Sequence, residues 1–132
     1  MKADEAPPAA TALAERCHVF TVFDVYEWEA IDWDDPDDAD GNYAHCKRHG
    51  VTETVVSDIL RERPVEITLR PTWSDFVIAG PDHGWSRLWT VLFDRSPKRG
   101  DWLRPVTGWW SKMAQVRQWE AITTRSWRGR HG

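Results

Sequence analysis

Residues 41–62, with the sequence GNYAHCKRHGVTETVVSDILRE, decide the expected fold of this chain. Residues 41–49 predict a short helix, which Gly50 is suited to end because glycine adopts the left-handed backbone conformation at little cost. Thr52 provides an N-cap for a second helix, and Pro64 prevents that helix from running on. The apolar residues of the second helix share one stripe, which favours packing on a core: Val55, Val56, Ile59 and Leu60.

The segments before these helices differ sharply in composition. Residues 1–17 are rich in Ala and Pro and predict a flexible tail. Residues 19–31 are rich in Val, Phe, Tyr and Trp and predict a strand. Residues 32–41 hold six aspartates with one proline and one glycine, which indicates a loop. We therefore expect a single domain over residues 18–119 that begins with a strand and an acidic loop.

After the two helices the pattern changes to strands. Alternation of apolar and polar residues predicts a half-buried strand over residues 65–69. Residues 109–119 favour a last helix, and residues 120–132 form a basic tail. The order indicates an α+β fold, a small antiparallel β-sheet with flanking helices. Three further strands are expected, the second apolar enough to be central, at residues 75–80, 85–93 and 102–107.

Length and composition narrow the class of protein. The 132 residues fit one domain with tails. No apolar run approaches the ~18 residues that a membrane-spanning helix needs, and the first residues lack the features of a signal peptide. We therefore expect a cytoplasmic protein without membrane contact. Cys17 and Cys46 are too few for a disulfide framework, and both are expected as reduced thiols, with Cys46 buried.

The net charge of −4 conceals a separation of charge along the chain. Residues 1–46 carry 12 acidic and 2 basic side chains, whereas residues 95–132 carry 9 basic and 2 acidic ones. This separation favours a basic surface for a polyanion or ends that attract each other, and a solvated loop and tail are the equal alternative. If the ends attract, residues 32–40 fold over the basic C-terminal region and mimic RNA phosphate.

The helix pair is part of a longer pattern. Trp33 and the acidic loop precede an Asn-x-x-His-x-x-x-His-Gly segment that runs from Asn42 to Gly50. Further along, Arg87 leads an apolar strand and Arg104 leads the last strand. Over residues 31–119 this arrangement resembles the BrnT family of bacterial ribonuclease toxins.

The resemblance implies a RelE-like fold in the order β-α-α-β-β-β-α. It implies the toxin of a type II toxin–antitoxin pair, an endoribonuclease that cuts mRNA without a metal or any other cofactor. It also implies a cognate antitoxin, usually a ribbon-helix-helix protein. Trp109 stands where the family has a second arginine. This departure favours the alternative of a catalytically inactive binding module, which holds a protein partner or nucleic acid through its tryptophans and basic C-terminal region.

Metal-independent RNA cleavage needs a base near the 2′-hydroxyl, an acid near the leaving 5′-oxygen and cations around the phosphorane. His45 and His49 are candidate catalytic residues because histidine titrates near neutrality. Arg87 and Arg104 are candidate catalytic cations because a guanidinium can hold a phosphate with two bonds. The candidate RNA-binding residues supply charge or stacking surfaces: Lys98, Arg99, Lys112, Trp109 and Trp110. Alternation along the strands is expected to place Arg87 with Trp85 and Trp89, and Arg104 with Trp102 and Val106.

Each candidate also has a purely structural interpretation. The arginines can stack on tryptophan at a sheet edge, the histidines can cap and pack a helix end, and the tryptophans can form the core or a partner interface. A zinc site at His45, Cys46 and His49 is a further alternative, but Cys46 points away from the histidines at this spacing. It would need another ligand, from Cys17, His18 or His83.

Overall fold

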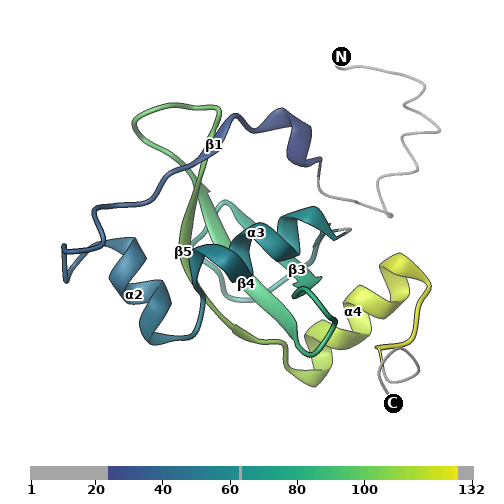
Figure 1. Cartoon of the computed structure of the whole chain (residues 1–132). Coiled ribbons are helices and arrows are strands. Elements are labelled where there is room, and N and C mark those ends of the chain that lie inside the picture. The colour runs from purple at the N-terminus through teal and green to yellow at the C-terminus, as the bar shows by residue number, and fades with distance from the viewer. Residues whose placement is uncertain (1–23, 63, 128–132) are drawn as a thin grey trace, which may run out of the picture.

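A five-stranded sheet in the order β1-β5-β4-β3-β2 forms the centre of the molecule (Figure 1). The computed structural model of the chain describes residues 24–62 and 64–127, so the expected tail over residues 1–17 lies outside the described residues. The strands are β1 (Ala30–Ile31), β2 (Val65–Glu66), β3 (Phe76–Pro81), β4 (Leu88–Arg95) and β5 (Trp102–Trp110). Helices pack around this sheet, which confirms the α+β class.

The sheet is mixed rather than antiparallel. β2, β3, β4 and β5 run antiparallel to their neighbours, as expected. β1 runs parallel to β5, with Ala30 opposite Trp102 and Ile31 opposite Leu103. The prediction of a purely antiparallel sheet is therefore wrong at this edge. The order β-α-α-β-β-β-α, which the resemblance implies, also has one strand fewer than the structure. A tight turn imposes the antiparallel direction only on strands that it connects, and no hairpin joins β1 to β5.

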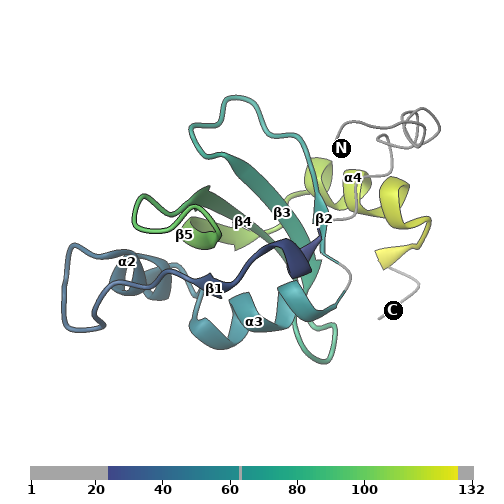
Figure 2. The ribbon, with the colours of Figure 1, turned by 90° about the horizontal axis from the view of Figure 1, so that it is seen from above.

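The α-helices of the described chain are α2 (Asn42–Arg48), α3 (Glu53–Arg61) and α4 (Met113–Thr123). Figure 2 shows α3 and α4 on opposite sides of the strands, whereas α2 lies beside β5. Within the described residues, no helix is long and apolar enough to cross a membrane. The basic tail expected from residue 120 begins inside α4, and residues 128–132 lie outside the described part of the chain.

The helix pair expected from residues 41–62 is present. Gly50 has a φ of +83°, and its N–H donates to the carbonyl of Lys47 at 2.9 Å. The hydroxyl of Thr52 accepts a hydrogen bond from the N–H of Val55 at 3.2 Å and caps α3. These local signals fix the turn between the helices, so that α2 reaches the edge of the sheet and α3 covers a face.

Two apolar clusters hold the helices against the sheet. The first lies on the α3 side and includes Val51, Val56, Ile59, Ile78, Trp89, Val91 and Phe93. The second lies on the α4 side and includes Val65, Val77, Leu88, Leu92 and Trp119. Trp85 and Trp127 pack against Trp119 in this second cluster. Part of the tryptophan content therefore serves the core.

Of the strand expected over residues 19–31, the described residues contain only β1. Residues 19–23 lie outside the described residues, and a 3₁₀ helix, η1 (Val25–Glu27), precedes β1. Val25 and Trp28 are three residues apart, and both pack against the first cluster, as does Ile31 of β1. This spacing suits a 3₁₀ turn, which brings every third side chain to one face, rather than the alternation of a strand.

The strand expected over residues 65–69 ends early as well. β2 stops at Glu66, and the side chain of Gln118 in α4 pairs with the next backbone groups. Its oxygen accepts from the N–H of Thr68 at 2.8 Å, and its amide donates to the carbonyl of Thr68 at 2.7 Å. A side chain from a distant helix thus pairs with the backbone at the open edge of the sheet, while Ile67 still donates to Val77 of β3.

β4 begins and ends later than expected, whereas β5 begins at the expected residue and ends later. β4 starts at Leu88 because the carboxylate of Asp82 accepts the backbone N–H groups of Ser86 and Arg87, which extends the turn. β5 continues to Trp110, so α4 begins at Met113 rather than at 109. The register shifts between Leu92 and Phe93, opposite Pro105. This irregularity fits Pro105, which has no N–H to donate to the ladder and is therefore suited to a bulge or an edge.

Candidate functional site

Arg104 of β5 fastens the acidic loop to the sheet. Its guanidinium donates to both carboxylate oxygens of Asp34, at 3.0 and 2.7 Å, and to Asp32 at 3.4 Å. The bond from Arg104 and the backbone N–H of Asn42 lower the pKa of Asp34 to about 2. Arg104 is therefore paired with two carboxylates and anchors the loop. Phosphate binding requires a cation that is free of such partners, so Arg104 does not fit that role.

Asp32 is the buried member of this network, with 1% of its side chain exposed. The hydroxyl of Ser96 donates to it at 2.6 Å, and the ammonium of Lys98 at 3.4 Å. Burial alone raises the pKa of Asp32, but Ser96, Lys98 and Arg104 together bring that pKa below its usual value. Lys98 thus has a structural partner. Arg99 pairs with Asp101 at 2.9 Å on the exposed side of the same turn.

Asn42, the first residue of α2, joins the loop, the helix and β5. Its side-chain oxygen accepts the N–H of Asp34 at 2.8 Å, while its own N–H donates to the Asp34 carboxylate at 2.8 Å. Its amide donates to the carbonyls of Asp32 and Pro105, at 3.0 and 2.9 Å. β1 pairs with β5 only at Trp102 and Leu103. Beyond that point, the Asn42 side chain provides the hydrogen-bond donor for the carbonyl of Pro105 in β5.

A polar pocket of about 360 Å³ lies between α2 and β5 and is lined by His45, Arg48, Arg104 and Asp94. The His45 Nε2 lies 3.2 Å from the hydroxyl of Thr107, and the centroids of the His45 and His49 rings are 4.8 Å apart. Burial, followed by the charges of His49 and Arg48, lowers the pKa of His45. Its lowered pKa favours the neutral imidazole of His45, which is the form that can accept a proton.

Arg48 is the cation that sequence reasoning missed. It is exposed, lines the same pocket as His45, and its one hydrogen bond within the described chain goes to the carbonyl of Ala39 at 3.4 Å. Lys47 is exposed beside it and adds to the charge of the last turn of α2. The run of Lys47, Arg48 and His49, which begins two residues after His45, was the feature of the sequence that could have identified Arg48.

Arg87 does not line this pocket. It precedes β4, and its guanidinium carbon sits 4.1 Å from the centroid of the Trp110 ring. Thr107, which contacts His45, pairs with Leu92, and Leu92 is five residues beyond Arg87, so about 16 Å of strand separates the two positions at ~3.3 Å per residue. The structure therefore brings His45, His49 and Arg104 together and leaves Arg87 out.

The expected placement of the tryptophans also needs correction. Trp85 does not share a strand face with Trp89: it has a φ of +61° in the turn and packs in the α4-side cluster, whereas Trp89 belongs to the α3-side cluster. The indole N–H of Trp109 donates to Gln115 at 3.0 Å, and Lys112 lies 6.0 Å from its ring centroid. Trp109 is thus tied into the α4 packing.

Trp110 is the tryptophan of this region that faces solvent. Its side chain is 57% exposed, and its ring contacts Trp89 edge-on at 6.4 Å. Met113 at the start of α4 is also 57% exposed. Of the two aromatic residues expected to stack on RNA bases, Trp110 has the free surface to do so.

No group of three or more His, Cys, Asp or Glu side chains in the described residues is placed to hold a metal ion. Cys46 is a free, buried cysteine, as expected, and its burial raises the pKa of the thiol to about 11. Cys17 and His18, the possible further ligands at the N-terminus, lie outside the described residues.

No family model, curated protein or solved structure matches the chain.

Proposed function

We propose that this protein is a BrnT-like toxin of a type II toxin–antitoxin pair, which cuts RNA in the cytoplasm without a metal. The observation that carries the proposal is the pocket at α2, where a neutral imidazole lies beside a second imidazole and an exposed arginine. This is the set of groups that transphosphorylation of RNA requires: a base, a proton donor and a cation.

Each of three side chains at α2 and its C-cap has one role in the proposed cleavage. His45, oriented by Thr107, accepts the proton of the 2′-hydroxyl as that oxygen attacks the phosphorus. His49 gives a proton to the departing 5′-oxygen, so the products are a 2′,3′-cyclic phosphate and a 5′-hydroxyl. Arg48 stabilises the charge on the phosphorane. In this scheme Arg104 is a positioning residue, since its bonds to Asp34 fasten the loop against which α2 begins.

The direct test is the incubation of a mixed-sequence RNA with the purified full chain in EDTA. We expect fragments with cyclic phosphate ends, and no fragments with His45→Ala. Intact RNA after incubation with well-folded protein would contradict the proposal.

The toxin role has a separate test in cells. We expect growth arrest when the chain is expressed alone, and relief when the neighbouring gene is expressed with it. A protein of the ribbon-helix-helix type is the antitoxin that the resemblance implies. Normal growth at high expression of the folded chain would contradict the toxin role. It would leave the proposed cleavage of RNA to be decided by the test in EDTA.

A second candidate function, a binding module without catalysis, is favoured by the exposed Trp110. Arg87 stacks on this ring at 4.1 Å, and Lys112 and Met113 follow it on the surface. Such a surface can hold a single-stranded nucleic acid or a protein partner. Titration of an RNA oligonucleotide against the indole fluorescence tests it: Trp110→Ala should weaken binding at least ~5-fold, the loss expected of one stacked base.

A further inference from the structure

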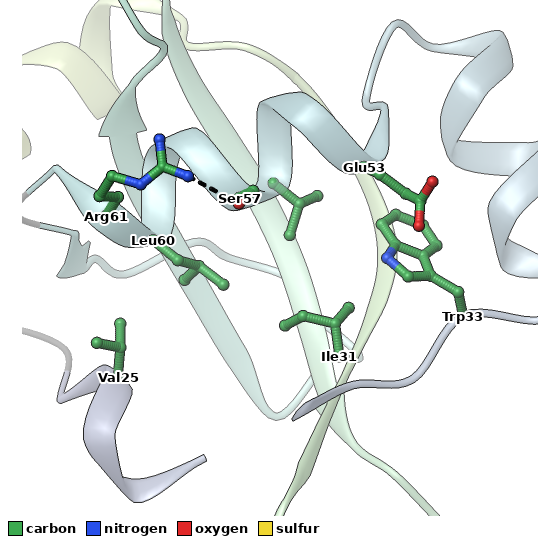
Figure 3. A pocket seen from close by; sticks show the side chains of 8 residues that line it. Val25, Ile31, Trp33, Glu53, Ser57, Leu60 and Arg61 are labelled. Atoms are coloured by element: carbon green, nitrogen blue, oxygen red, sulfur yellow. Dashed lines mark hydrogen bonds between the residues drawn. The ribbon is translucent and has the colours of Figure 1, made fainter. Parts of the chain in front are cut away.

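An apolar groove runs between α3 and the segment that leads into β1, on the far side of the molecule from α4. It has a volume of about 510 Å³, and its floor is formed by Val25, Ile31, Trp33, Val56 and Leu60 (Figure 3). A second hollow of about 210 Å³ continues it toward Trp28 and Leu103. Figure 3 shows Val25 and Leu60 on two sides of an open space, with Ile31 between them and Trp33.

The groove is an unfilled part of the first core. Val25, Ile31, Trp33 and Leu60 are only partly buried although they all pack against the buried cluster. Such contiguous apolar surface is costly to leave in water, at roughly 25 cal/mol for each Å². Its rim carries Glu53 and Arg61, one charge of each sign. The rim therefore selects neither a polyanion nor a polycation, and the occupant is expected to be apolar.

We propose that residues 19–23 of this same chain, with the sequence VFTVF, pack into the groove. Four of these five side chains are large and apolar, and none is charged. The segment directly precedes Asp24, and Val25 already lines the groove. Residues 19–23 are thus tethered at the groove itself.

The length of the segment fits the groove. The seven residues from 19 to Val25 are joined by six steps and span at most about 20 Å when extended. α3 has nine residues and is about 13 Å long, so the segment can follow the whole helix. The tether favours the chain's own segment over a partner, because a short linker gives an effective concentration on the order of millimolar.

The test compares variants of the full chain by thermal unfolding. The double variant Phe20→Ser/Phe23→Ser should lower Tm by at least about 5 °C, as expected for the loss of a docked apolar segment from a domain of this size. The matched control is Trp73→Ser, at a side chain that is 88% exposed, and it should leave Tm nearly unchanged. An unchanged Tm in the double variant would overturn the proposal.

A cycle with the groove identifies where the segment packs. In a Leu60→Ala background the same double variant should lower Tm by less than it does in the natural chain, because the two changes remove one shared contact. Full additivity would place the segment elsewhere and overturn the proposal. Size-exclusion chromatography gives the other contradicting outcome: a dimer that dissociates on Leu60→Asp would assign the groove to a second copy of the chain.

Discussion

Arg104 shows how a residue with the chemistry of a phosphate ligand can serve the fold. Its partners Asp32 and Asp34 are 72 and 70 residues away in the chain, so no local pattern could reveal them. The sequence identified Arg104 as important through its place in the BrnT-like pattern. Its pairing with carboxylates, which decides between anchoring and catalysis, depends on the folded arrangement.

The anchoring role predicts a loss of stability. Arg104→Ala should reduce the free energy of unfolding by about 2–3 kcal/mol, because it leaves the buried Asp32 and its neighbour Asp34 with fewer partners. Urea unfolding measures this. The matched control is Arg99→Ala, which removes an exposed ion pair on the same hairpin and should have little effect. Equal effects of the two substitutions would show that Arg104 does not anchor the loop.

Asp34 makes stability depend on pH in a defined window. Its pKa is about 2 in the folded protein against an ordinary value of 3.8, so the unfolded chain binds the proton more readily. The stabilisation is therefore complete above about pH 4 and is lost as the pH falls toward 2. Urea unfolding from pH 5 to 2 should show this slope, and Asp34→Asn should flatten it. An unchanged slope in the variant would assign the acid sensitivity to other carboxylates.

At the scale of elements, local signals predicted what depends on neighbours in sequence. Gly50 and Thr52 fix the boundary between α2 and α3, and the structure confirms both. The bounds of β5 and α4 could not be predicted in this way. Trp109 and Trp110 suit a helix or a strand, and only their pairing with Thr90 and Trp89 extends β5 to Trp110.

The attachment of α2 to β5 rests on Asn42. Asn42→Ala should reduce the free energy of unfolding by about 2–3 kcal/mol, because the carbonyls of Asp32 and Pro105 lose their donor. Thr52→Ala, which removes only the cap of α3, should cost about 1 kcal/mol. Chemical denaturation of both variants gives the comparison. A smaller loss for Asn42→Ala than for Thr52→Ala would contradict the account of α2.

Gly108 sets the contact between β5 and the turn after α2. A Cβ at this position would lie 2.8 Å from the carbonyl oxygen of Thr90 and 3.0 Å from Val51. Gly108→Ala should therefore destabilise the protein by about 1–3 kcal/mol through overpacking. Gly100→Ala, where the nearest heavy atom is 4.0 Å away, is the control and should be nearly neutral in the same thermal melts. Equal melting temperatures for Gly108→Ala and Gly100→Ala would contradict the close contact of Gly108 with Thr90 and Val51.

At the scale of the whole molecule, the separation of charge is partly neutralised within the fold. Asp32 and Asp34 reach Lys98 and Arg104, as the attraction between the acidic loop and the basic region predicted. The other loop aspartates are exposed, and two of their carboxylates accept backbone N–H groups of the loop itself. Within the acidic loop, only Asp32 and Asp34 therefore pair with cations of the basic region, as a bound phosphate would.

The exposed aspartates should repel RNA from α2. The triple variant Asp35→Asn, Asp37→Asn and Asp38→Asn should raise affinity for an RNA oligonucleotide by about 3- to 10-fold at low salt, with little change at high salt. Fluorescence anisotropy measures both. Replacement of three acids outside the loop and α2, Glu27, Glu62 and Glu120, by Gln is the control for net charge alone. An equal gain in the control would show that the loop has no local effect.

The most direct test of the central claim compares His45→Ala with Arg87→Ala in the cleavage of RNA in EDTA. The account places His45 in the reacting site, and Arg87 lies about 16 Å along the sheet from the strand position that His45 contacts. It predicts that His45→Ala lowers the rate at least ~100-fold, the usual contribution of a general base, and that Arg87→Ala leaves it within about 3-fold. Cleavage that survives in His45→Ala but is lost in Arg87→Ala would contradict the assignment and move the active site to the surface around Trp110.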